Sequence, residues 1–191
     1  MPDNVANKAY VSTGAPRVAG AIFRAPVGTP LPTSASSALN AAFKTLGYIS
    51  EDGYTNSNTR DSETIKDWSG ADIMTVQTGK TDEFSWTMLE SLNEEVLKEI
   101  YGDDNVTGSL DTGYEIKANA TELTSHAYVI DVLLNGGYIK RTVIPEGKIT
   151  EISEITYKKD EAIAYEVTVT AMPDSSENTH YEYIEAEDDS E

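Results

Sequence analysis

The sequence predicts a mainly β fold, with antiparallel sheets in a β-sandwich or barrel-like arrangement and one flanking α-helix. Three observations support this prediction. In residues 163–171 apolar and polar side chains alternate, and a period of two gives a strand one apolar and one polar face. The turn residues Asn135, Gly136 and Gly137 follow an apolar extended run, and they tolerate the positive φ that a tight hairpin requires. At about residues 89–101 the apolar spacing changes to that of a helix.

The centre of the predicted sheet is a meander over residues 126–172. Residues 126–134 and 138–144 should pair as a hairpin around the turn, and Pro145 should end the second strand because proline has no N–H to donate. In the first of these strands Asp131 lies on one face, and the apolar side chains lie on the other. These apolar residues are Tyr128, Ile130, Val132 and Leu134.

Two helices are expected beside the strands. The first covers about residues 89–101, with an Asn93 cap near its start and Gly102 at its end. Its apolar stripe consists of Leu89, Leu92, Val96, Leu97 and Ile100. The second is a short helix over about residues 35–46, where small and apolar side chains recur at helical spacing.

The chain divides into an arm, one domain and a tail. Residues 1–34 contain five prolines, which indicates an extended N-terminal arm with at most a short edge strand near residues 19–24. Residues 35–184 should form a single β domain that includes a long hairpin with polar tips at residues 54–88. Residues 185–191 are expected to form an acidic, disordered tail.

Charge is the strongest feature of the composition, because the chain has a net charge of −19. Residues 1–60 hold five Lys and Arg against three Asp and Glu, so the whole negative excess lies in the remaining residues. Such a surface repels nucleic acid instead of binding it. For any single carboxylate, an ordinary solvated position that maintains solubility is the alternative interpretation.

The sequence contains no pattern typical of an active site, a cofactor site or a metal site. His126 and His180 have no metal-motif spacing, and the chain has no cysteine. Phosphate-binding glycine loops and the nucleophile motif GxSxG are absent as well. No apolar run approaches the roughly 18 residues of a membrane span, so membrane binding by this chain is not expected. We therefore expect neither an enzyme nor a cofactor.

Six segments, taken in order, resemble a known family. They are GAIFRAPVGTPLPT, LNAAFKTLGYISEDGYTNSN, ETIKDWSGADIMTVQT, EVLKEIYGDDNVTG, NGGYIKRTVIP and AMPDSSENTHYEYI. Together, over about residues 14–184, they resemble the major tail tube protein of siphoviruses, the bacteriophages with long non-contractile tails. The resemblance implies hexameric rings with a continuous inner β-barrel, which stack into a tube around the tape measure protein and later conduct DNA during ejection.

The resemblance also implies partners and a place in the virion. The chain would contact itself, the tape measure protein, and the distal tail and tail terminator proteins, with phage DNA present only in transit. It would belong to the virion tail and assemble in the cytoplasm of the bacterial host. Two alternatives stay open on the residues alone: a carbohydrate-binding or adhesion β-sandwich module of a phage tail, and an acidic hydrolase.

The candidate site residues follow from the tube hypothesis. An acidic lumen would keep DNA phosphates from adhering, and the candidates for its lining are Asp131, Glu151, Glu154 and Glu166. In the arm, Arg17 and Arg24 are candidates for docking on an acidic neighbouring subunit. In the long hairpin, the candidates for contacts between subunits are Arg60, Lys66 and Trp68.

Overall fold

The computed structural model describes residues 6–17 and 20–187, and in these residues the fold is mainly β with a single α-helix, α1 (Glu94–Tyr101), as the sequence predicted. Two short 3-10 turns are present at Lys8–Tyr10 and Asp103–Asn105. The strands are β1 (Gly14–Pro16), β2 (Ile22–Pro26), β3 (Lys44–Thr45), β4 (Ile49–Lys66), β5 (Asp72–Met88), β6 (Val106–Ser109), β7 (Gly113–Ile116), β8 (His126–Leu134), β9 (Tyr138–Ile152), β10 (Tyr165–Ala171) and β11 (Tyr181–Ala186).

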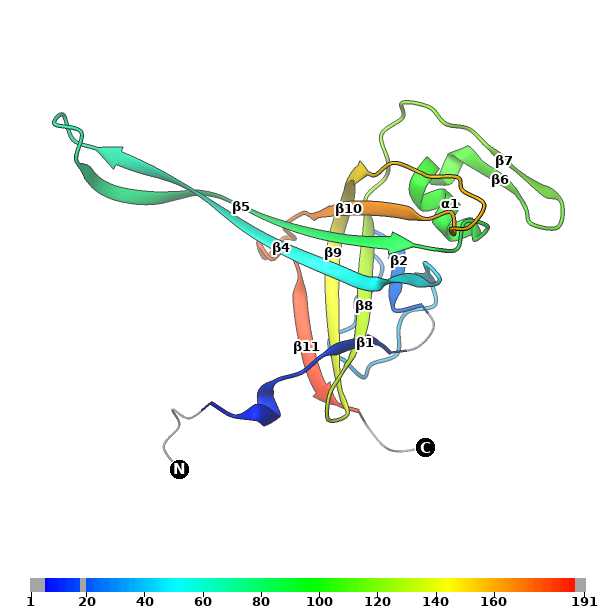
Figure 1. Ribbon diagram of the computed structural model, residues 1–191, viewed down its shortest axis with the longest axis horizontal. Coiled ribbons are helices and arrows are strands. Elements are labelled where there is room, and N and C mark those ends of the chain that lie inside the picture. Colours follow the sequence, from blue (N-terminus) through cyan, green and yellow to red (C-terminus); the bar gives the residue numbers. More distant parts are fainter. Residues whose placement is uncertain (1–5, 18–19, 188–191) are drawn as a thin grey trace.

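One long strand, β9, joins two layers. The main sheet has the order β3-β2-β8-β9-β10-β5-β4, with β1 added on β8 and β11 added on β9, and every pairing is antiparallel. Residues 138–147 of β9 pair with β8, whereas residues 147–152 pair with β10. In Figure 1 the strands β4, β5 and β10 cross steeply over β8, β9 and β11. The sheet therefore folds over itself into two stacked layers.

Gly147 lies where β9 passes from one layer to the other. A Cβ at this position would lie 2.6 Å from Val169 Cγ1 and 2.9 Å from Tyr128 Cε2. Side chains essentially never approach that closely, so only glycine lets these elements pack at the bend.

The larger core fills the space between the two layers and α1. It combines apolar side chains from β2, β5, α1, β8, β9 and β10. Its members include the large side chains Phe84, Trp86, Met88, Tyr128, Ile130 and Tyr165. Toward the end of β5, Phe84, Trp86 and Met88 face this core while the side chains between them do not, which is the alternation expected for a half-buried strand.

A smaller core covers the other face of β2, β8 and β9. Ala127, Val129 and Val143 pack there against Phe43, with Leu39 and other side chains from the loop before β3 around them. Consequently β8 is buried on both faces, and its expected polar face, including Asp131, is not open to solvent.

The predicted helix at residues 89–101 is present, but it begins at Glu94. Asn93 is its N-cap, has extended φ and ψ, and accepts a hydrogen bond from the Glu95 N–H, so the preceding residues cannot continue the helix. Gly102, with φ of 95°, ends the helix as predicted. Of the predicted apolar stripe, Leu92 lies before the cap and is 63% exposed.

The helix predicted at residues 35–46 is wrong, because the segment is a series of bends and turns. The carbonyl oxygens of Ser34 and Ser37 accept hydrogen bonds from Arg141 Nη1 at 3.1 and 2.6 Å, and the Ser34 hydroxyl accepts one from the Ser37 N–H. These contacts replace the bonds that a helix would need. The apolar residues Phe43 and Leu46 are buried, but against other strands.

The segments predicted as arm and tail are partly built into the sheet. Residues 14–16 form β1, and residues 22–26 form β2 between β3 and β8. At the other end, residues 185–186 are the last residues of β11. Residues 1–5 of the predicted arm, its residues 18–19, and residues 188–191 of the predicted tail lie outside the described residues.

The two tryptophans allow a matched test of this core. Trp86 is 2% exposed, whereas Trp68 is fully exposed. We expect Trp86→Ala to lower the free energy of unfolding by about 3–5 kcal/mol, because it leaves a large cavity. Trp68→Ala should change the monomer's stability by less than about 0.5 kcal/mol. Urea unfolding at concentrations where both variants are monomeric measures the two effects, and equal losses would contradict this packing.

Candidate functional site

Four strands share an accessible polar face. The cross-strand registers of β9, β10, β5 and β4 bring hydroxyl and charged side chains together on one side, while the other side of β5 and β10 faces the core. The face comprises Thr55, Glu83, Ser85, Thr87, Lys148, Glu151, Glu166, Thr168 and Thr170. Hydroxyls pair across the strands, Ser85 with Thr168 at 2.9 Å and Thr150 with Thr170 at 3.0 Å. The surface is therefore polar and has three carboxylates against one lysine.

The predicted lining residues fall in different places. Glu151 and Glu166 lie on the polar face and are exposed. Glu154 is exposed just beyond the end of β9. Glu83, which the sequence reasoning did not select, lies on the same face opposite Thr170. Alternation already assigned Glu83 to the polar side of its strand, but only the pairing of β5 with β10 puts it on the same face as Glu166.

Asp131 is buried in an ion pair within the chain. Its carboxylate oxygens accept two parallel hydrogen bonds from Arg141 Nε and Nη2, each at 2.7 Å. This two-pronged geometry is the strong form of an Arg–carboxylate pair. Arg17 Nη1 lies 3.9 Å from the same carboxylate. Asp131 thus anchors β8 to β9 and to the loop that Arg141 also contacts.

The polar sheet ends in two strand edges. β4 is the last strand of the order, so its outer side has no partner among the described strands. At the other end, residues 148–152 of β9 pair with β10 only, because the pairing of β9 with β8 stops at Gly147. Unpaired N–H and C=O groups at a sheet edge are templates for another strand.

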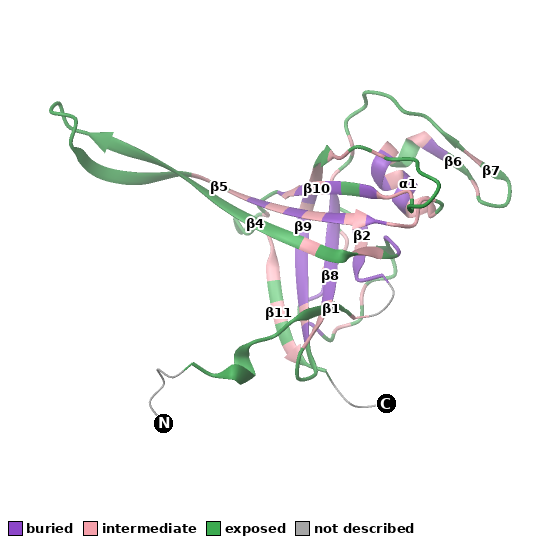
Figure 2. Cartoon of the chain, in the orientation of Figure 1, coloured by how far each residue is buried: buried purple, intermediate pink, exposed green. Residues whose placement is uncertain are grey.

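Beyond the body, β4 and β5 continue as a two-stranded ribbon, residues 59–81. Nearly all of its side chains are exposed on both faces, and Figure 2 shows it as a green extension leaving the buried body. Apolar side chains are concentrated toward its tip, where Ile65 pairs with Met74 across the strands, near Val76. Ile73 and Trp68 are exposed there as well. A lone two-stranded ribbon is marginally stable in water, so contact with a partner would stabilise this one.

The candidate contact residues of the long hairpin are on this ribbon. Arg60 Nη1 donates to Gln77 Oε1 at 3.3 Å, and Lys66 Nζ lies 3.2 Å from Asp72 Oδ1 with both side chains largely exposed. Trp68 is in the turn at the tip. All three are accessible to a neighbouring molecule.

The root of the ribbon is held by one buried carboxylate, Asp82. It accepts hydrogen bonds from Lys80 Nζ at 2.7 Å, from the Thr179 hydroxyl and from the Asn58 amide. Burial works to raise the pKa of Asp82, but the bonds from Lys80 and Thr179 and the charge of Lys80 outweigh it, so the pKa is lowered. Asp82 therefore joins both ribbon strands to the segment before β11.

Arg24 is buried inside the subunit and fastens α1 to the sheet. It is 4% exposed, and its guanidinium contacts Glu95 at 3.0 Å, Glu99 at 2.9 Å and Asp103 at 2.8 Å. Burial acts to lower the pKa of Arg24, but attraction by Glu99 and Asp103 exceeds it and raises the pKa. Every nitrogen of this guanidinium is engaged within the chain.

Tyr128 completes this buried cluster by donating its hydroxyl to Glu99 Oε1 at 2.6 Å. Burial, followed by the charge of Glu99, raises the pKa of Tyr128 well above its ordinary value. His126 lies beside the group, with Nε2 3.2 Å from Asp103 Oδ2. The cluster has a structural role, because the Arg24 guanidinium contacts all three of its carboxylates and so holds α1 and the turn after it against the sheet.

Within the described residues, no group of His, Asp and Glu side chains is arranged to hold a metal ion. No helix among them has the length and hydropathy needed to cross a membrane.

The Asp82 anchor predicts a pH-dependent effect. Asp82→Asn should lower the free energy of unfolding by about 2 kcal/mol at pH 7, because it removes a charge from buried hydrogen bonds. A carboxylate with a lowered folded pKa stabilises above its unfolded pKa, near 4, and that contribution is lost as the pH falls through the folded value. Urea unfolding of both proteins should therefore converge at acid pH. The exposed Asp72→Asn is the control and should have little effect at either pH.

Comparison with known proteins identifies the family. A family model described as phage tail tube protein matches residues 9–190, almost the whole chain. No curated protein matches this chain. Proteins of this family are structural components of the virion tail and not enzymes. On the extent of that match, the chain belongs to the phage tail tube protein family.

Proposed function

We propose that the chain forms hexameric rings through the two strand edges of its polar sheet, and that the rings stack into a tube that conducts DNA during ejection. The observation that supports this most is the four-stranded polar sheet, which ends at β4 on one side and at residues 148–152 of β9 on the other. Family membership supports the tube, because tail tube proteins assemble with copies of themselves.

The directions of the strands suit such a junction. All neighbours in the sheet are antiparallel, so the first and last of its four strands run in opposite directions. When β4 of one copy meets β9 of the next, the junction is again antiparallel and continues the same hydrogen-bond pattern. An interface between two different edges repeats around a ring until it closes, and closure removes the exposed edges.

The polar face is the proposed lining of the channel. The opposite face of these strands packs on the core, and the layer of β2, β8, β9 and β11 would then lie outside. Around a ring, Glu83, Glu151 and Glu166 would be repeated in every copy. Charges act on DNA over about 8 Å at physiological salt, so carboxylates on the lining repel phosphates and the short paired hydroxyls offer them little to bind.

The ribbon and the N-terminal segment are the proposed contacts between rings. The ribbon presents Ile65, Trp68, Met74 and Val76 away from the body, and residues 7–13 are exposed beside β1. The proposed further partners are the tape measure, distal tail and tail terminator proteins, with assembly in the cytoplasm of the bacterial host. Arg24 has no part in these contacts in our proposal, because its own subunit occupies it.

Two adjacent proline substitutions test ring closure. Backbone N–H groups of β4 point alternately toward β5 and toward its free edge, so Asn56→Pro and Ser57→Pro remove one of each kind. We expect one variant to fold normally yet fail to form rings, and the other to lose stability. Light scattering with electron microscopy measures assembly, and circular dichroism measures folding. Ring formation by both folded variants would contradict pairing at this edge.

A charge reversal tests the lining. Glu166→Lys should leave tube assembly intact but slow or block DNA ejection from phage carrying it, because a lysine attracts phosphates. Glu115→Lys, on the separate β6–β7 hairpin, is the matched control and should eject DNA at the wild-type rate. Ejection followed with a DNA-binding dye compares them. Normal kinetics for Glu166→Lys would remove this residue from the channel surface.

A further inference from the structure

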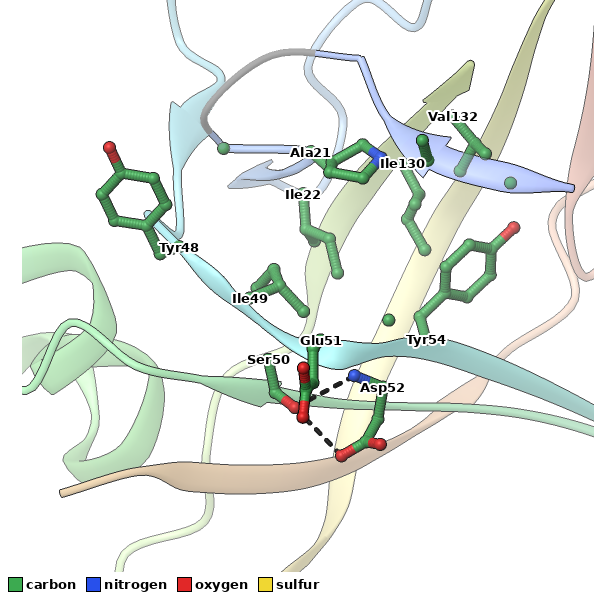
Figure 3. A pocket seen from close by; sticks show the side chains of 15 residues that line it. Ala21, Ile22, Tyr48, Ile49, Ser50, Glu51, Asp52, Tyr54, Ile130 and Val132 are labelled. Carbon is green, nitrogen blue, oxygen red and sulfur yellow. Dashed lines mark hydrogen bonds between the residues drawn. The ribbon is translucent and has the colours of Figure 1, made fainter. Parts of the chain in front are cut away.

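An open pocket lies at the base of β4, between β1, β2 and β8 (Figure 3). Its volume is about 650 Å³, and its apolar wall consists of Ile22, Ile49, Tyr54, Ile130 and Val132. The carboxylates of Glu51 and Asp52 belong to its polar rim. The pocket lies where the register of β4 with β5 shifts between Ile49 and Tyr54, and the wall residues Ile49, Tyr54 and Val132, which pack against the main core, are only partly buried. An apolar cavity of this size and openness suits a large side chain.

The ribbon tip, residues 67–71, presents an aromatic side chain that matches this pocket in size. Trp68 is fully exposed, and its turn is already ordered. The Asp67 N–H donates to the Ala71 carbonyl at 2.9 Å, and Asp67 Oδ1 accepts from the Ala71 N–H at 2.9 Å and from the Ser69 hydroxyl at 2.6 Å. A rigid turn that presents an aromatic side chain to water loses little conformational freedom on binding.

We infer that the pocket receives the ribbon tip, with Trp68 as its anchor, of a copy in the adjacent ring. This inference rests on the proposed function. The tip and the pocket lie at opposite ends of β4, which begins at Ile49 and ends at Lys66. A strand of this length spans roughly 60 Å, so a copy cannot fill its own pocket. Head-to-tail contact between opposite ends repeats without closing, which is the property that a growing tube needs.

The dimensions agree with this arrangement. Strands in closed barrels tilt by about 40° from the axis, so the tip lies on the order of 45 Å from the pocket along the tube. A compact domain of this size is roughly 40 Å across, which sets the spacing of stacked rings. The tip of one ring therefore reaches the level of the pocket in the next.

Engineered disulfides test the contact, because the chain has no cysteine of its own. Copies carrying Ser69→Cys at the tip are mixed with copies carrying either Tyr48→Cys or Asp52→Cys at the pocket, assembled and mildly oxidised. Bridging requires Cα atoms within about 7 Å, so we expect covalent dimers with at least one pocket position. Ile184→Cys, equally exposed on β11, is the control and should give none. Adding Trp68→Ala to the Ser69→Cys copy should abolish the dimers.

The outcomes separate this inference from the proposed function. Tubes seen by electron microscopy without dimers at either pocket position, or with equal dimers at Ile184→Cys, would overturn the pocket assignment and leave the tube proposal standing. Failure of the wild-type chain to form rings or tubes at any concentration would contradict the proposed function, and the pocket assignment with it.

Discussion

The fold depends on one strand that is shared by two layers. β9 pairs with β8 and β11 along its first part and with β10 along its second, and the main core fills the angle between them. Gly147 makes this possible, because a side chain there would collide with Val169 and Tyr128. The same transition ends the pairing with β8 and leaves residues 148–152 with a free edge. The bend that encloses the core thus also leaves an edge of β9 unpaired by β8.

Buried charged side chains fix the position of α1 on the body. Arg24 forms ion pairs with carboxylates of α1 and of the turn that follows it, and Tyr128 donates a hydrogen bond to one of these carboxylates. Buried ion pairs add little net stability over an apolar core, but each charge requires its partners in one geometry. The cluster therefore defines how α1 sits on the sheet. A rigid body of this kind can hold its strand edges in the positions that a ring requires.

The body and its extensions differ in how many of their polar groups are paired, and how many of their apolar side chains are buried, within the chain. Inside the body, buried charged side chains find hydrogen-bond partners in the chain, whereas β4, the edge of β9 and the ribbon present unpaired edges and apolar side chains to water. Membership of the tail tube family gives these features a common reason, since neighbouring copies can supply what one copy lacks. The side chains that build the core are thus different from those that the chain leaves open to a partner.

By itself the sequence determined the class of fold, the presence of α1 with its end at Gly102, and the two faces of β10 and of residues 82–88 of β5, because turns and side-chain alternation are local. It placed the start of α1 at about residue 89, whereas the helix begins at Glu94, after the Asn93 cap. It did not reveal that Asp131 and Arg24 are buried in ion pairs, or that residues 35–46 are irregular, because Arg141 and other distant partners decide these outcomes. The tertiary structure alone placed Glu83 on the same face as Glu166 and formed the pocket at the base of β4. Those arrangements arise from pairings between strands far apart in the chain, which no local pattern records.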